Sequence, residues 1–433
     1  MSTTAPKTVP DPLAIDGGRP CVVDPPDSHF HGPAEIGEEE IAAVTAALRT
    51  RNLFRFGKSA EDSPTARFEK QFAGMTAVPH ALAVNSGPSA LICALVGLGV
   101  SSGDEVIVPA YTYIATAAAV LARGAFPVIA EVDGSLTLDP SEVERKITPR
   151  TRCILPVHMR GVPCRMDELL AVAAKHKVSV LEDCAQANGG RYHGRPLGSF
   201  GAAAAFSFQQ YKIITAGEGG AFVTADKQVF DRGACFHDSA YAFWKQRDNE
   251  LSIAPFLGEN YRMNEMSGAL VLAQLGKREA ILTRCRATKK RLLETVAELP
   301  DLKPQDVPDP EGDCGTTLVL FVADSRLAKW FAAALRAEGM AAGSIFDEGI
   351  PDRHIYYHWD YILDQRTPDR NGYPWQGTQP RCQVEYSREM CPRSIDLLSR
   401  TVIIPINQRM SDAHVASCAS ALRKVYHQRK RGA

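Results

Sequence analysis

Long apolar runs, paired cysteines and an excess of charge of one sign are all missing from this sequence of 433 residues. No stretch approaches the roughly 18 apolar residues that a membrane span needs, so we expect no membrane helix. The net charge of −1 argues against a broad surface for nucleic acid or anionic lipid. Eleven dispersed cysteines without a CxxC pair predict reduced thiols and no bound metal. Since the first twenty residues also lack a charged-then-apolar secretory layout, we expect a cytoplasmic protein.

Domain organisation follows from length and from shifts in composition. A chain of 433 residues, 45% of them hydrophobic, is too long for one compact unit and predicts two domains. The beginning of the chain is rich in proline, aspartate and glycine, which predicts an extended arm over residues 1–35. We expect a large domain over residues 36–285 and a smaller C-terminal α/β domain over residues 286–433.

The fold class is predicted by a regular alternation of apolar strands and amphipathic helices over residues 81–225. Strands as apolar as "DEVIVP" and "VSVLED", separated by helices, indicate an α/β fold with a mostly parallel sheet covered on both faces. A long helical segment over residues 263–299 leads into the small domain, and the aromatic-rich stretch 346–390 predicts an ordered loop. In such a sheet, ligands bind where the carboxyl ends of the strands open into loops.

Two ionisable side chains follow neighbouring strands at that edge. "VSVLED" ends in Asp183; a buried carboxylate needs a cation or hydrogen-bond donors, so an ion pair or a helix cap is the simpler interpretation. Lys212 lies 29 residues later in "FSFQQYKIITAGEGG", after one intervening strand. A desolvated lysine is suited to forming an imine with a carbonyl group, although a single lysine is more often an exposed side chain.

"NSGPSAL" predicts an anion site at the start of a helix. Gly87 permits a sharp turn, and Pro88 and Ser89 open a helix whose free backbone N–H groups suit a phosphate. Many strand–helix turns look alike, so this motif alone is weak evidence. "PAYTYIAT" adds Tyr113, a flat ring just beyond another strand end. A lysine for an aldehyde, an acid for a pyridine nitrogen, an anion cradle and a stacking ring are together what pyridoxal 5′-phosphate (PLP) requires.

The chain resembles the DegT/DnrJ/EryC1/StrS family of PLP-dependent aminotransferases, strongly from about residue 36 to residue 274 and loosely beyond. The resemblance implies the fold type I architecture of PLP-dependent transferases, with a large domain and a smaller C-terminal domain. The matching segments are "IGEEEIAAV", "NSGPSAL", "GDEVIVPAYTYIATAAAVLARGAFPVIAEVD", "ILPVHMRG", "LEDCAQANGGRYHGRPLGSFG", "FSFQQYKIITAGEGG" and "NYRMNEMSGAL".

The resemblance implies a role for each residue around the cofactor ring. Lys212 is expected to form the Schiff base and to carry the proton during transfer, and Asp183 to keep the pyridine nitrogen protonated. Gln186 is expected near the phenolic oxygen, and Tyr113 against the face of the ring. Gly217, Gly219 and Gly220 are expected to let the backbone turn with no Cβ against the cofactor.

The resemblance also implies a phosphate site and a shared dimer interface. Gly87 and its followers match the phosphate cradle, and Ser207 in "FSF" matches a phosphate-binding hydroxyl. Pro88 stands where the family usually has threonine; it suits the first turn of a helix but lacks an N–H, and we expect the Ser89 hydroxyl to replace the missing group. Asn260 matches a residue that reaches the active site of the partner subunit, so the functional unit is expected to be a homodimer.

Two further residues lie near the expected substrate entrance. The family's common "PVHLYG" is "PVHMRG" here, which introduces Arg160. An arginine suits a substrate carboxylate or phosphate, with a surface salt bridge as the alternative. His158 closes the preceding strand, and it is either a substrate contact or a hydrogen-bonded core histidine.

The predicted function is transfer of an amino group from glutamate or glutamine to the ketone of a keto-sugar or of an inosose-like cyclitol, in amino-sugar or antibiotic biosynthesis. Two alternatives stay open: dehydration and aromatisation of the aminohydroxybenzoate-synthase type on the same scaffold, and an accessory subunit that holds PLP without turnover. Relatives that act as sugar dehydratases carry histidine at the lysine position, so Lys212 argues against that activity.

Overall fold

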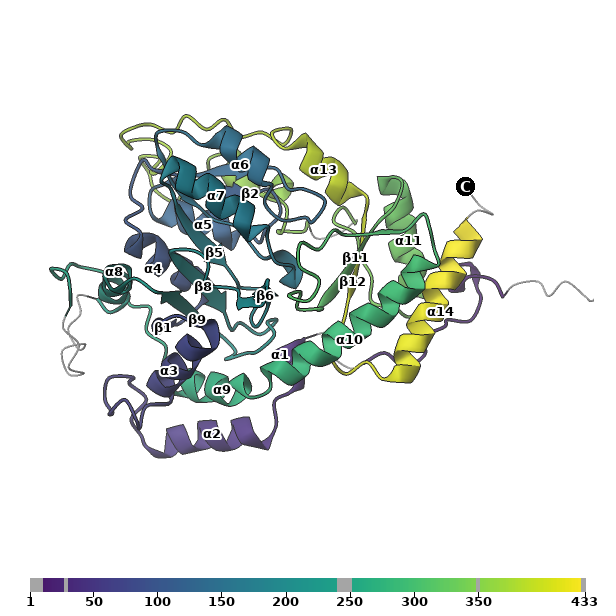
Figure 1. Cartoon of the computed structure of the whole chain (residues 1–433), viewed down its shortest axis with the longest axis horizontal. Coiled ribbons are helices and arrows are strands. Elements are labelled where there is room, and N and C mark those ends of the chain that lie inside the picture. Colours follow the sequence, from purple (N-terminus) through teal and green to yellow (C-terminus); the bar gives the residue numbers. More distant parts are fainter. Residues whose placement is uncertain (1–10, 27–29, 240–250, 348–350, 430–433) are drawn as a thin grey trace, which may run out of the picture.

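The computed structural model describes residues 11–26, 30–239, 251–347 and 351–429. A seven-stranded sheet in the order β1-β9-β8-β5-β4-β2-β3 forms the centre of the large domain (Figure 1). Only β9 runs antiparallel to its neighbours, so the predicted mostly parallel sheet is confirmed. Its strands are β1 (His80–Val84), β2 (Glu105–Pro109), β3 (Phe126–Ala130), β4 (Thr151–Ile154), β5 (Ser179–Asp183), β8 (Ala203–Ser207) and β9 (Gly220–Thr224).

Both faces of this sheet are covered, because its side chains alternate between two buried apolar clusters. In β8, Ala204 and Phe206 belong to one cluster, while Ala203 and Ala205 belong to the other. The helices of this domain are α1 (His31–Ala34), α2 (Glu38–Arg49), α3 (Pro64–Thr76), α4 (Gly87–Gly97), α5 (Ala115–Ala122), α6 (Pro140–Lys146), α7 (Met166–His176), α8 (Lys227–His237) and α9 (Glu265–Leu275); β6 (Arg191–Tyr192) and β7 (Arg195–Pro196) form a short hairpin.

The helical character expected over residues 263–299 is confirmed, and the segment consists of two helices. The break between α9 and α10 (Arg278–Ala297) falls at Gly276 and Lys277. Glycine is a poor helix former, and the Lys277 ammonium at the break donates to the carbonyl oxygen of Glu35 at 2.7 Å and to Glu40 at 2.8 Å. This pairing ties the break to the beginning of the large domain.

The small domain is built on a three-stranded antiparallel sheet in the order β10-β11-β12. Residues 13–22 of the N-terminal arm pack against this domain: Leu13 and Val22 are buried, and the N–H groups of Ala14 and Cys21 donate to the Glu338 carboxylate. Its remaining elements are β10 (Lys303–Pro304), β11 (Thr317–Phe321), β12 (Thr401–Pro405), α11 (Ser325–Ala337), α13 (Pro392–Ser399) and α14 (Asp412–Gln428).

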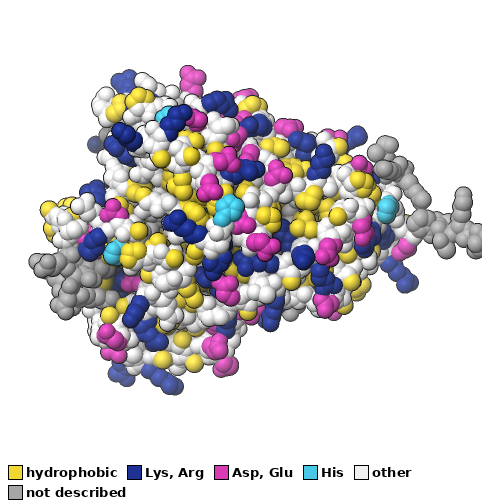
Figure 2. Space-filling view, viewed as in Figure 1, with side chains coloured by type: hydrophobic (Ala, Val, Ile, Leu, Met, Phe, Trp, Pro, Cys, Tyr) yellow, Lys and Arg dark blue, Asp and Glu magenta, His cyan; other side chains and the backbone are white. Residues whose placement is uncertain are grey.

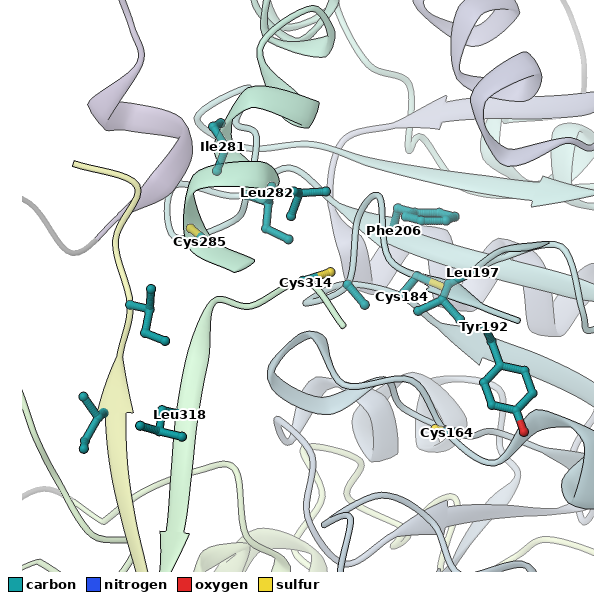
Figure 3. Close-up of a cluster of buried hydrophobic side chains, with 14 of the residues drawn as sticks. Cys164, Cys184, Tyr192, Leu197, Phe206, Ile281, Leu282, Cys285, Cys314 and Leu318 are labelled. Atoms are coloured by element: carbon teal, nitrogen blue, oxygen red, sulfur yellow. The ribbon is translucent and has the colours of Figure 1, made fainter. Parts of the chain in front are cut away.

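One buried apolar cluster runs from the large sheet through α10 into the small domain (Figure 3). Phe206 comes from β8, Leu282 and Cys285 from α10, and Leu318 from β11. Figure 1 shows α10 running from the large domain toward α14, against which it packs. The domain boundary at residue 285 stays a prediction, and α10 passes through it.

Of the aromatic-rich stretch 346–390, the structure describes residues 346–347 and 351–390, and the part from residue 351 onward packs on the large domain. It contains α12 (Asp360–Leu363) after a short 3₁₀ helix. Its Trp375 ring lies 6.1 Å from that of Phe126, and the Tyr386 hydroxyl donates to the carbonyl oxygen of Pro127 at 2.8 Å. This segment lies in the sequence between strands of the small domain, but it packs on the large domain.

Among the described residues, no helix combines the length and the apolar character that crossing a membrane requires. Basic and acidic side chains are interspersed over the face shown in Figure 2. All eleven cysteines are free thiols, and nine of them are buried.

Candidate active site

Asp183 ends β5 with a buried carboxylate that neutral groups hold in place. Its Oδ1 accepts from the N–H of Ala185 at 3.0 Å, and its Oδ2 accepts from the hydroxyl of Thr116 on α5 at 2.9 Å. Burial raises the pKa of Asp183, against the opposing effect of these two hydrogen bonds and of the Lys212 charge. No described cation forms an ion pair with Asp183 within 4.0 Å, so the simple ion-pair interpretation does not apply. A buried acid of this kind suits a cationic N–H donor brought by a ligand.

Lys212 follows β8, the strand that pairs with β5, and lies within electrostatic range of Asp183. The N–H of Ala216 donates to the carbonyl oxygen of Phe208 at 2.8 Å, which closes the loop that carries Lys212. The carbonyl oxygen of Lys212 accepts from the N–H of Gly32 in α1 at 3.1 Å, so the loop is fastened at its tip. Burial lowers the pKa of the Lys212 ammonium, and the Asp183 carboxylate only partly offsets this effect. A larger share of the uncharged, nucleophilic amine is therefore present near neutral pH.

The start of α4 lies directly against Ser207, although 120 residues separate them in the sequence. A Cβ placed on Gly87 would lie 2.8 Å from the Cβ of Ser207, so only glycine fits this approach. Ser86 caps the helix by accepting from the N–H of Ser89 at 3.1 Å. The Ser89 hydroxyl, expected at the phosphate, donates to Asn85 Oδ1 at 2.6 Å. A helix N-terminus beside a serine hydroxyl has the donors that a phosphate requires.

The glycines after Lys212 allow both a sharp turn and a close approach of two backbones. Gly217 has φ of +76°, which supports the sharp turn. A Cβ on Gly220, however, would lie 2.9 Å from the backbone nitrogen of Gly87, in the turn before α4. The absent side chain therefore lets β9 pack against the turn that opens α4, and the expected clearance for the cofactor stays a prediction.

Arg160 and Gln186 meet at the entrance of the site. The N–H of Arg160 donates to Gln186 Oε1 at 3.0 Å, and the residue reaches this position with φ of +54°. Its Nε donates to the Tyr111 hydroxyl at 2.6 Å, and its guanidinium lies 5.8 Å from the centre of the Tyr111 ring. Arg160 is thus held by a neutral tyrosine, and no described carboxylate forms a salt bridge with it within 4.0 Å.

Of the two interpretations of His158, the structure favours a hydrogen-bonded core histidine over a substrate contact. Its Nδ1 accepts from the N–H of Cys164 at 3.0 Å, so its Nε2–H donates to Glu182 Oε2 at 3.2 Å, and the side chain is fully buried. Both ring nitrogens are occupied, which leaves neither for a substrate. This pair supports the end of β5, next to Asp183.

His158, Glu182 and Cys184 place three ligand-type atoms within 4.8 Å of one another. The Glu182 oxygens already accept from His158 and from three backbone N–H groups. Burial raises the pKa of the Cys184 thiol to about 12, so it stays protonated rather than becoming a thiolate ligand. The group is a hydrogen-bond network within the core, and it gives no support to a metal centre.

Tyr113 is 48% exposed and lies beside the segment that begins at residue 351. Its ring centre is 5.3 Å from that of His354, whose Nδ1 lies 2.7 Å from Asp352 Oδ1. Sequence reasoning missed Asp352 and His354 at the site, as well as Thr116. The only signal was the aromatic and histidine content of the stretch 346–390.

Asn260 is the predicted site residue that joins none of these contacts. It is exposed, pairs with Asp238 in an isolated bridge, and accepts through Oδ1 from the N–H of Arg262 at 3.3 Å. Its predicted role in a partner's site remains a prediction.

The residues present fit PLP. Asp183 is a buried acid with no ion-pair partner among the described residues, and a Cβ on Gly87 would fill the space beside Ser207. Lys212 would hold the aldehyde carbon, Asp183 the ring nitrogen and Gln186 the phenolic oxygen. The phosphate would take Ser207 and the turn that opens α4.

Comparison with known proteins shows the family of the chain. The model of the DegT/DnrJ/EryC1/StrS aminotransferase family matches residues 34–369. The chain therefore belongs to this family of PLP-dependent sugar aminotransferases. It is similar in structure to 3-amino-5-hydroxybenzoic acid synthase, with a TM-score of 0.76 and 26% identity over 95% of this chain and 100% of that one. This similarity confirms the fold type I architecture.

Three relatives illustrate the range of similarity. The spore coat polysaccharide biosynthesis protein SpsC of Bacillus subtilis (strain 168) is 31% identical over 90% of this chain and 95% of its own length. GDP-perosamine synthase of Escherichia coli O157:H7 is 40% identical over 51% of this chain, which spans 59% of that protein. L-glutamine:2-deoxy-scyllo-inosose aminotransferase of Micromonospora echinospora is 38% identical over 55% of this chain, which spans 58% of that protein.

Proposed function

We propose that this aminotransferase moves an amino group from glutamate or glutamine to the ketone of a keto-sugar or cyclitol. The observation that carries the proposal is the lysine with a lowered pKa, Lys212, beside the unpaired buried acid Asp183. The named activities of the Escherichia and Micromonospora relatives support a sugar or cyclitol acceptor, and the Micromonospora name supports glutamine as donor.

Each side chain then has a task that its surroundings suit. PLP, when bound, supplies an electron sink that stabilises negative charge on the reacting carbon. Asp183 keeps a proton on the ring nitrogen, and Lys212 Nζ accepts the proton from the donor's α carbon and later delivers one to the acceptor's carbon. The Arg160 guanidinium binds the carboxylate of the amino donor, because no described carboxylate in the chain pairs with it.

We also propose a homodimer in which Asn260 completes the partner's site. Exposed apolar side chains are frequent near the N-terminal helices, as an interface requires; they include Phe30, Ile36, Ile41, Leu48 and Phe54. Mixing equal amounts of inactive Lys212→Ala and Asn260→Ala chains should restore about a quarter of wild-type activity, because half of the dimers become mixed and each mixed dimer has one intact site of two. No recovery after verified subunit exchange would reject the shared site.

Lys212→Ala tests the chemistry, with the exposed Lys290→Ala on α10 as its matched control. Wild type and the control should release the keto acid of glutamate or glutamine in the first half-reaction and then aminate members of a panel of keto-sugars and inososes, as detected by mass spectrometry. Borohydride reduction should fix the cofactor on the peptide that contains Lys212. Lys212→Ala should show neither turnover nor cofactor labelling. Turnover of this variant at the wild-type rate would reject Lys212 as the catalytic lysine.

The same measurements separate the two alternatives. A dehydrated, aromatised product without transfer of nitrogen would indicate chemistry of the hydroxybenzoate type. No release of keto acid from either donor, with the cofactor bound, would indicate an accessory subunit.

A further inference from the structure

The segment beginning at residue 351 is fastened to the loop between β2 and α5, which carries Tyr113. The N–H of Ile114 donates to the carbonyl oxygen of Arg353 at 3.0 Å, and the N–H of Tyr356 donates to that of Ala110, also at 3.0 Å. These two backbone hydrogen bonds flank His354 and Ile355 and leave them little freedom. The side chains of this segment are therefore fixed relative to the active site.

Within the segment, His354 holds the carboxylate of Asp352 in one orientation. Asp352 Oδ1 accepts from the backbone N–H of His354 at 2.9 Å, and the His354 Nδ1 lies 2.7 Å away. Burial lowers the pKa of His354, an effect that the charges of Arg160 and Lys212 reinforce and the bond to Asp352 opposes, so the imidazole is neutral near pH 7. A neutral imidazole that donates through Nδ1 orients the carboxylate without neutralising it.

Asp352 and Arg160 are neighbours that do not pair. Each appears among the charges that shift the other's pKa, yet no salt bridge forms between them within 4.0 Å. The Asp352 side chain is 26% exposed. Burial raises the pKa of Asp352, but the His354 hydrogen bond and the Arg160 charge outweigh this effect, and the pKa lies below its usual range. The site entrance thus has fixed hydrogen-bond acceptors on the Asp352 carboxylate and fixed donors on the Arg160 guanidinium.

These two groups fit different ligands. A carboxylate can only accept hydrogen bonds, so it attracts hydroxyl groups and repels phosphate and carboxylate groups. Arg160 is the complementary group, which suits the donor's carboxylate. The two substrates of the reaction can therefore occupy one site in turn by using different halves of it.

We propose that Asp352, positioned by His354, selects the keto acceptor by accepting hydrogen bonds from the hydroxyl groups of an uncharged polyhydroxylated ring. This inference rests on the proposed function and names the side of the site that recognises the acceptor. It predicts that Asp352 acts in the second half-reaction and hardly in the first.

Asp352→Asn separates the two half-reactions while keeping the shape of the side chain. For scyllo-inosose, kcat/KM in the second half-reaction should fall roughly 10- to 100-fold, the range for losing hydrogen bonds to a charged group. The rate of keto-acid release from glutamine should stay within about twofold. Asp364→Asn, which breaks an exposed ion pair with Arg366 in the same segment, is the matched control and should change neither. An equal fall in both half-reactions, or no fall in either, would overturn the proposal.

Singly deoxygenated scyllo-inososes provide a readout that a purely structural role would not affect. The wild type should discriminate against at least one of them by about tenfold relative to scyllo-inosose, and Asp352→Asn should treat the same pair as nearly equal. Identical discrimination by both enzymes would overturn the proposal. If the wild type completes the glutamine half-reaction but aminates none of these cyclitols, the proposed acceptor class is overturned. If neither glutamate nor glutamine supports the first half-reaction, the proposed function is rejected instead.

Discussion

The backbone N–H of Arg160 donates to the side-chain oxygen of Gln186 over 3.0 Å. Because an amide has one oxygen and one NH₂ group, this bond leaves the NH₂ group of Gln186 to face the phenolic oxygen in the proposed placement of PLP. The φ of +54° that Arg160 adopts is costly for a residue with a Cβ, so the hydrogen bond and the contact with Tyr111 must hold it there. Arg160 thus orients the Gln186 side chain through its backbone N–H, in addition to placing its charge at the site entrance.

Gln186→Glu tests this orientation. The substitution keeps the oxygen that accepts from Arg160 but replaces the NH₂ donor by a charged acceptor facing the phenolic oxygen. We expect PLP to bind at least tenfold more weakly, as measured by fluorescence titration of the apoprotein. Unchanged affinity would show that Gln186 does not contact the cofactor.

Thr116→Val removes the side-chain hydrogen bond to Asp183 while keeping the size of the residue. Losing one hydrogen bond to a buried acid should cost about 1–3 kcal/mol, and kcat should fall roughly 5- to 100-fold. Thr116→Ser, which keeps the hydroxyl, should recover most of the rate. A valine variant as active as wild type would contradict the positioning role of Thr116.

Gly87→Ala introduces a methyl group 2.8 Å from the Cβ of Ser207. Such overpacking should lower the free energy of unfolding by about 1–3 kcal/mol and weaken PLP binding. Gly74→Ala in α3, where a Cβ meets nothing within 4 Å, is the control, and it should be neutral or stabilising by up to about 1 kcal/mol. Denaturant unfolding of the apoproteins and PLP titration check both expectations.

Acid should destabilise the protein through His237. Burial, reinforced by the Arg55 charge, lowers the pKa of His237 from 6.5 to about 3. The unfolded chain binds this proton at higher pH than the folded one, so the contribution is full above pH 6.5 and is lost as the pH falls toward 3. Between pH 7 and pH 5 the loss is about 2 kcal/mol.

Urea unfolding at these two pH values measures the effect. His237→Phe, which fills the site with a ring that cannot be protonated, should remove about that much of the pH dependence. A variant with the same pH dependence as wild type would show that other groups dominate acid sensitivity.

The strands and most of the helices that cover them were predictable because their signals are local, whereas the roles of the cofactor residues stay predictions. Apolar runs specify strands, and the turn residues of "NSGPSAL" specify the start of a helix. The approach of Gly87 to Ser207 and the role of Gly220 were not predictable, because both depend on side-by-side packing of segments distant in sequence.

Asp352 and His354 were missed for the same reason. Nothing near them in the sequence resembles a binding motif, and they reach the site through hydrogen bonds to the loop between β2 and α5, more than 200 residues earlier. His158 shows the converse: its place at a strand end suggested a substrate contact, but its two ring nitrogens are used by Glu182 and the backbone of Cys164.

The helix α10 has a consequence for how the molecule comes apart. Its Arg278 donates to Asn188 of the large domain, and its Lys289 pairs with Asp313, on the approach to β11. Its buried Leu282 and Leu292 belong to the same apolar cluster as Phe206 and Leu318. Unfolding of either domain would expose the face of α10 that packs on it. Heating should therefore give a single cooperative transition in calorimetry rather than two separate peaks.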